Sequence, residues 1–136
     1  MSRQTLAQRR AAHALGRIET YKNAGVDSYK NYVSYVEALP ATILMNGLGQ
    51  AAATLLSKAE GDLKKPHGLL YADVQDWLCG SDAAVPYRNT TGGNDRLMQA
   101  ILARDEGMYL RAQAEALEYL VWLKKFANAW LERPRE

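Results

Sequence analysis

Apolar residues recur at steps of three and four positions along most of the chain. The first row of this kind begins at Ala7 and ends at Tyr21, and Asn23-Ala24-Gly25 follows it. Such steps place side chains on one face of an α-helix, and a glycine after the last apolar turn commonly ends the helix. The pattern therefore predicts a first helix over about residues 4–24.

A second row of mainly aromatic and β-branched side chains follows Asp27 and Ser28, either of which can cap a helix at its amino-terminal end. The row consists of Tyr29, Tyr32, Val33 and Val36. Proline has no N–H group and suits the first turn of a helix better than its interior. We therefore expect Pro40 to end the second helix and to begin a third, which runs from about Pro40 to Lys58.

The middle of this third helix is built from small residues, in the segment Asn46-Gly47-Leu48-Gly49-Gln50-Ala51. Two glycines inside a helix cost roughly 1 kcal/mol each relative to alanine. Close approach of a neighbouring helix would offset this cost. We therefore predict a helix-packing role for four residues of the segment: Asn46, Gly47, Gly49 and Ala51.

Three more helices are predicted in the second half of the chain. A loop from Glu60 to Pro66 precedes a fourth helix that ends near Cys79-Gly80, and a turn-rich segment occupies residues 81–94. A short fifth helix follows, and the sixth, from about residue 105 to 132, is the longest. No domain linker or strand-like alternation interrupts the pattern. The sequence thus predicts an all-α fold, a single-domain bundle of about six helices over residues 1–136.

The sixth helix has an unusually wide apolar arc. It combines two adjacent lines of side chains, Tyr119, Trp122 and Phe126 on one and Ala116, Leu120, Leu123 and Ala127 on the other. Together the two lines span roughly half the circumference of the helix. Such a helix either packs on two sides or offers one edge to a partner, and with six helices available we expect the first.

Charge is balanced overall but uneven along the chain. A formal net charge of +2 with 24% charged residues is ordinary for a globular protein and is too small to indicate nucleic-acid binding. Residues 1–24, however, contain five basic side chains against the single acid Glu19. The single cysteine, Cys79, is expected to be a buried thiol, which fits a reducing cytoplasm. No apolar run is long enough to cross a membrane.

No set of residues indicates catalysis, and we expect the protein not to be an enzyme and to need neither cofactor nor metal. His13, His67 and Cys79 do not stand at ligand-like spacings. Asp73 and Asp76 are interpreted as acids on the water-exposed face of the fourth helix. The Gly47–Gly49 pair lacks the third glycine of a dinucleotide motif and lies within a predicted helix.

Binding residues are easier to propose. On the first helix Arg10, His13 and Arg17 fall within about 60° of arc, beside the apolar face, where guanidinium groups can donate to phosphate oxygens. His13 is expected to be a hydrogen-bonding residue at the rim of the core. The predicted contact is to the RNA backbone and does not depend on sequence. Its candidate residues are Arg3, Arg9, Arg10, Arg17, Lys22, Arg111, Lys124 and Lys125.

Three blocks of the sequence are similar to a known family. They are Leu39-Pro40-Ala41, then Ile43 with Asn46-Gly47-Leu48-Gly49-Gln50-Ala51, and Glu115-Ala116-Leu117 with Trp122-Leu123-Lys124-Lys125-Phe126-Ala127. In these blocks the chain resembles the small helical subunit of the type III-B CRISPR effector, the Cmr complex. Ala52 and Thr54 are smaller or more polar than the residues expected at these positions of the family.

The resemblance implies a fold of about six helices and no enzymatic activity. In the family's complex, several copies stack into an inner filament beside the backbone subunits, which carry the guide RNA, and help to bind single-stranded target RNA in antiviral defence. Two alternatives come from the residues alone. One is a DNA-binding regulator whose helix-turn-helix is joined at Leu39-Pro40, and the other is a helical adaptor with only protein partners.

Overall fold

The structure is a computed structural model that describes residues 3–24 and 29–131. Over these ranges it contains six α-helices and no strand: α1 (Leu6–Ala24), α2 (Tyr29–Asn46), α3 (Leu48–Lys58), α4 (Pro66–Leu78), α5 (Arg96–Ala103) and α6 (Glu106–Trp130). The predicted all-α fold with its longest helix last is confirmed. The predicted capping residues Asp27 and Ser28 lie outside the described residues.

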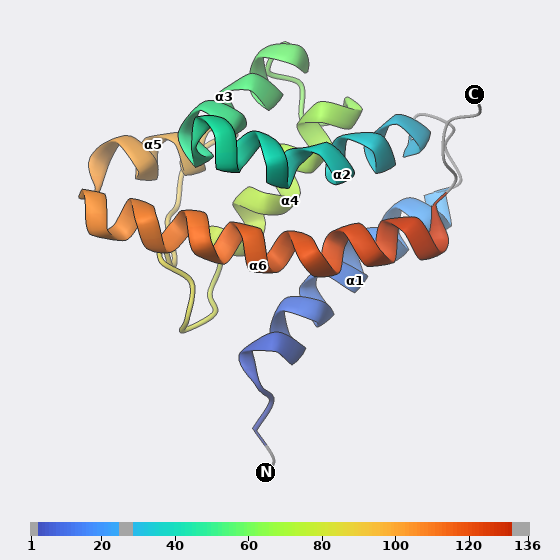
Figure 1. The fold of residues 1–136 in the computed structure, drawn as a ribbon, viewed down its shortest axis with the longest axis horizontal. Coiled ribbons are helices and arrows are strands. Elements are labelled where there is room, and N and C mark those ends of the chain that lie inside the picture. The colour runs from blue at the N-terminus through green and yellow to red at the C-terminus, as the bar shows by residue number, and fades with distance from the viewer. Residues whose placement is uncertain (1–2, 25–28, 132–136) are drawn as a thin grey trace.

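Helix α6 is the element around which the others are arranged (Figure 1). It spans the molecule alongside α2, and α1 and α4 cross behind it. Its buried face, which includes Tyr119, Leu120 and Leu123, packs against both α1 and α2, as the wide apolar arc predicted. The amino-terminal end of α6 is fixed by Asp105, whose carboxylate accepts a hydrogen bond from the backbone N–H of Met108.

The predicted boundary at Pro40 is wrong, because α2 continues through this proline to Asn46. A proline inside a helix costs about 3 kcal/mol. Here the neighbouring Leu39 and Ile43 are buried, and packing of this face against the other helices outweighs the local penalty. The structure therefore has no turn at Leu39-Pro40, which removes the basis for a helix-turn-helix at this position.

The chain turns instead at Gly47, whose φ of +87° lies in the left-handed region that favours glycine. The Gly47–Gly49 segment therefore begins α3, and the prediction that it lies in the interior of a helix is wrong. Side chains of α6 bind the first free N–H groups of α3: the N–H of Leu48 donates to Oε1 of Gln113 at 2.9 Å, and that of Gly49 donates to the Tyr109 hydroxyl at 2.8 Å. A Cβ atom at Gly47 would lie 2.9 Å from the same hydroxyl. Glycine thus permits the close approach of α6.

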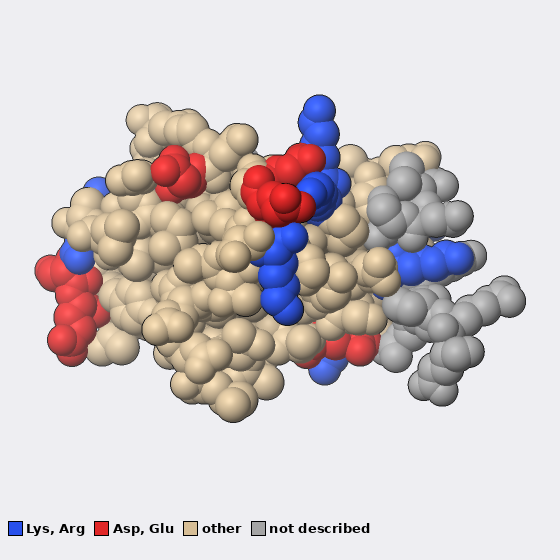
Figure 2. Space-filling view, turned by 90° about the horizontal axis from the view of Figure 1, so that it is seen from above, with Lys and Arg blue, Asp and Glu red and all other residues tan. Residues whose placement is uncertain are grey.

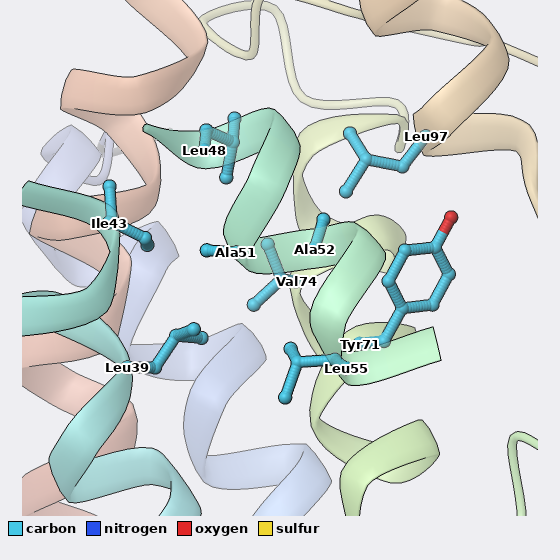
Figure 3. A pocket seen from close by; sticks show the side chains of 9 residues that line it. All are labelled: Leu39, Ile43, Leu48, Ala51, Ala52, Leu55, Tyr71, Val74 and Leu97. Atoms are coloured by element: carbon cyan, nitrogen blue, oxygen red, sulfur yellow. The ribbon is translucent and has the colours of Figure 1, made fainter. Parts of the chain in front are cut away.

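A small apolar cavity lies beside the next turn of α3, between α2, α4 and α5 (Figure 3). The space open to the centre of a water molecule is about 10 Å³, and the walls are almost entirely apolar. Such a space, at the lower limit for one water molecule and without polar partners, is expected to be dry. Ala52 is buried and lines the cavity, so a small residue coincides with a packing gap.

Replacing Ala52 with valine is expected to fill part of this gap. The control is Ala53→Val, on the exposed side of the same helix, which carries the same cost of a β-branched residue in a helix without the burial. Because each buried methyl group contributes about 0.8 kcal/mol, A52V should exceed A53V in unfolding free energy by about 1 kcal/mol. Urea denaturation of both variants measures the difference. Equal stabilities would show that the cavity cannot accept the added methyl groups.

Candidate functional site

All three arginines of α1 that were predicted to bind RNA form ion pairs within the protein: Arg9, Arg10 and Arg17. Arg10 makes a two-pronged contact with Glu115 of α6: its Nε donates at 2.6 Å and its NH2 at 2.8 Å. The indole N–H of Trp77, on α4, donates to the same carboxylate at 3.0 Å. Glu115 is only 8% exposed, so Arg10 neutralises a buried charge where α1, α4 and α6 meet.

Arg17 contacts Asp73 of α4, a residue predicted to be exposed to water and now found to be fully buried. Nε of Arg17 donates to Oδ1 of Asp73 at 2.6 Å, and the hydroxyls of Tyr21 and Tyr32 donate at 2.6 Å and 2.5 Å. Asp73 lies on the buried face of α4 because Leu70, three positions earlier, and Val74 also point into the core. The water-exposed interpretation of Asp73 is therefore wrong.

Burial governs the ionisation of this cluster. It raises the pKa of the Asp73 carboxyl above its ordinary value, against the opposing effect of Arg17 and of the two tyrosine hydroxyls. Burial together with the nearby carboxylate also raises the pKa of Tyr21 and of Tyr32, so both hydroxyls stay protonated as donors. Burial alone would lower the pKa of Arg17, but Asp73 and Tyr21 raise it. Arg17 therefore stays charged.

Two further contacts complete the polar row along α1. Nε of Arg9 donates to Asp82, in the segment after α4, at 2.7 Å. The ring of His13 lies between Tyr119 and Asp76, with Nδ1 2.6 Å from the tyrosine hydroxyl and Nε2 2.7 Å from the carboxylate. The hydrogen bond from His13 lowers the pKa of Asp76. His13 therefore is the hydrogen-bonding rim residue that the sequence predicted.

The basic residues of α1 therefore direct many of their hydrogen bonds to acidic side chains of the same protein. The remaining candidates, Arg3, Lys22, Arg111, Lys124 and Lys125, are exposed. They are distributed over the start of the chain, the end of α1 and both halves of α6, and Lys22 places its ammonium group 5.9 Å from the ring centre of Trp130. On the face seen from above α2 and α3, basic and acidic side chains lie next to one another and most of the surface is uncharged (Figure 2). The row that the sequence predicted on the first helix, with Arg10, His13 and Arg17, therefore contacts the protein itself, and the exposed candidates lie apart from it.

Three further features concern metal binding, the single cysteine and membrane insertion. Over residues 3–24 and 29–131, no three His, Cys, Asp or Glu side chains are grouped in a way that could hold a metal ion. Cys79 is buried, as predicted, and burial raises the pKa of its thiol to about 11. None of the described helices is both long enough and apolar enough to span a membrane.

Sequence comparison identifies the class of protein to which this bundle belongs. Residues 6–130 match the family model described as CRISPR-associated protein (Cas_Cmr5), which covers nearly the whole described chain. The protein therefore belongs to this family of small subunits of the Cmr, or type III-B, CRISPR complexes. Membership implies assembly with the other subunits of such a complex.

Proposed function

We propose that the protein is a non-catalytic subunit that stacks with further copies of itself in an inner filament of the Cmr complex and helps to bind guide and target RNA. The observation that carries this proposal is the family match over residues 6–130. The exposed cations support the RNA contact, because lysine and arginine side chains that reach solvent can neutralise backbone phosphates. We further propose that the complex acts in antiviral defence in the cytoplasm.

The ion pairs change which residues are best suited to this contact. Arg10 and Arg17 bind buried or nearly buried carboxylates, so their removal would disturb the fold as well as any RNA contact. Arg3, Lys22 and Lys124 do not take part in ion pairs between described residues. These three residues therefore allow RNA binding to be tested separately from folding.

The test compares complexes reconstituted with the wild-type chain, without it, and with the triple variant Arg3→Glu/Lys22→Glu/Lys124→Glu. We expect binding of complementary RNA to weaken in the last two, and the salt dependence of the triple variant to flatten by about one unit of slope for each phosphate that is no longer neutralised. Lys58→Glu, a charge reversal at an exposed position outside the candidate set, is the control and should leave affinity unchanged. Equal affinity with and without the chain would contradict the RNA-binding role.

A further inference from the structure

The outward side of α6 carries a second apolar row, separate from the face that packs into the core. Leu110, Ala114, Leu117 and Val121 follow one another at steps of four, three and four positions. Leu110 is 55% exposed and Val121 is 47% exposed, Ala114 is exposed, and Leu117 is partly buried. In Figure 1 no other helix lies in front of α6 over this stretch. Contiguous apolar surface of this kind marks a site of protein interaction.

The order of residues in this row matches the same row of a second copy that runs in the opposite direction. Alternating steps of four and three keep a seam directed at a facing helix. In an antiparallel pair centred on the row, Leu110 lies level with Val121 of the second copy, and Ala114 lies level with Leu117. The small side chain of Ala114 thus leaves room for a leucine. In a parallel pair Ala114 would lie level with its own copy, and the layer would contain a gap.

The charged side chains on one edge of the row also match a second copy. Arg111 and Glu118 are both exposed on this edge. At a rise of about 1.5 Å per residue, Arg111 of one copy and Glu118 of the other stand about 3 Å apart along the helix axis, and the two-fold symmetry repeats the contact. The two copies of Glu118 stand about 7.5 Å apart along the axis, as do Arg111 and Lys125 of different copies. The opposite charges are therefore closer than the like charges, and attraction prevails.

The other edge of the row supplies a further match. Glu106 and Lys124 are exposed on this edge, near the two ends of α6. In the antiparallel pair they stand about 1.5 Å apart along the axis, again as two contacts between opposite charges. A parallel pair would bring Glu106 to Arg111 but would bring Glu118 to the uncharged Gln113. Charge on both edges thus favours the antiparallel arrangement.

We propose that the outward face of α6 binds the same face of a second copy of this chain, in an antiparallel pair with two-fold symmetry. The pair forms from the chain alone and rests neither on RNA contact nor on other subunits. A two-fold contact closes at two copies, so it differs from the repeated contact of a filament, which continues through other faces.

Sedimentation equilibrium of the isolated chain tests the pair through its charges, and we expect an equilibrium between monomer and dimer. Glu118→Arg places an arginine opposite Arg111 in both symmetry-related contacts and should raise the dissociation constant about tenfold. Arg111→Glu should have a similar effect because it joins two acids. The double variant Arg111→Glu/Glu118→Arg restores both contacts with the signs exchanged and should return to within about threefold of the wild type.

The control for these reversals is Glu19→Arg, at an exposed position on α1, which should leave the dissociation constant unchanged. Circular dichroism confirms that each variant is folded. A wild-type chain that stays monomeric at about 0.5 mM would overturn the proposal. Single reversals without effect, or a double variant as weak as the single ones, would overturn it too. No RNA is present, so the outcome is separate from that of the RNA-binding test.

Cysteine crosslinking tests the direction of the second copy. Leu110→Cys and Val121→Cys variants are oxidised mildly, each alone and as a mixture, with the wild type as the control for buried Cys79. We expect a disulfide between chains in the mixture only. In the antiparallel pair each position stands about 16.5 Å along the axis from its own copy, which is too far for a disulfide. Crosslinking of each variant with itself, or none in the mixture, would contradict the antiparallel pair.

Discussion

Replacing Asp73 with alanine should lower the free energy of unfolding by about 3–5 kcal/mol, because it removes one partner of a buried ion pair. Asp73 is fully buried and accepts hydrogen bonds from Arg17, Tyr21 and Tyr32. Without the carboxylate, the buried hydroxyls of Tyr21 and Tyr32 have no acceptor, and Arg17, whose side chain is 34% exposed, loses its partner. Unsatisfied buried donors of this kind are among the most destabilising changes in a protein.

The matched control for this prediction is Asp76→Ala, three positions along the same helix. Asp76 also contacts α1, through His13, and accepts a hydrogen bond from Arg96 of α5. Its side chain is 50% exposed, so in the variant water can take the place of the carboxylate beside His13. We expect the unfolding free energy of this variant to fall by about 1 kcal/mol or less. Chemical denaturation of both proteins gives the comparison, and similar decreases would mean that the burial of Asp73 does not decide its contribution.

Helix content could be predicted from the sequence because the steps of three and four positions are a local property. The place where α2 ends could not. Pro40 carries a strong local penalty inside a helix, and the burial of Leu39 and Ile43 that overcomes it depends on helices distant in sequence. The turn at Gly47 likewise depends on α6, which supplies Tyr109 and Gln113 to the first N–H groups of α3.

The candidate site was predicted less well, and Asp73 shows why. Its position between Leu70 and Val74 placed it on the apolar face of α4, and this signal was available. An aspartate is usually exposed, so its residue type indicated water instead. The decision between the two depends on donors 41 to 56 positions away in the chain, because only they make burial of a carboxylate tolerable.

The row of polar contacts gives α1 a role that its composition did not reveal. Arg9 and Arg10 share one turn of α1, and His13 and Arg17 lie on the next two turns. Each binds an acid from α4, α6 or the segment between α4 and α5. Buried polar contacts require correct partners and geometry, whereas apolar surfaces tolerate sliding. The contacts therefore fix the rotation and the register of α1 against the bundle. Arginines in an amino-terminal segment can thus stabilise the fold through ion pairs within the protein, and their presence alone does not indicate a ligand-binding surface.

Replacing Gly68 with alanine should destabilise the protein by about 2–3 kcal/mol, because the added methyl group would overlap the backbone. A Cβ atom at this position, in the first turn of α4, would lie 2.1 Å from the carbonyl oxygen of Asp62 and 2.7 Å from the Cα of Leu63. Backbone atoms cannot rotate away as the end of a flexible side chain can. The loop between α3 and α4 would therefore have to move, together with the hydrogen bond from Lys65 N–H to the Asp62 carbonyl.

Gly16 provides a control in which the same substitution has the opposite sign. It lies within α1, and a Cβ atom there would meet no other atom within 4 Å. Alanine in a helix is favoured over glycine by about 0.5–1 kcal/mol, so Gly16→Ala should raise the unfolding free energy while Gly68→Ala lowers it. Thermal and urea denaturation of the two variants measure both signs. If Gly68→Ala were as stable as the wild type, the loop would have to reposition at no cost, and the close approach of the loop to α4 would not limit the choice of residue.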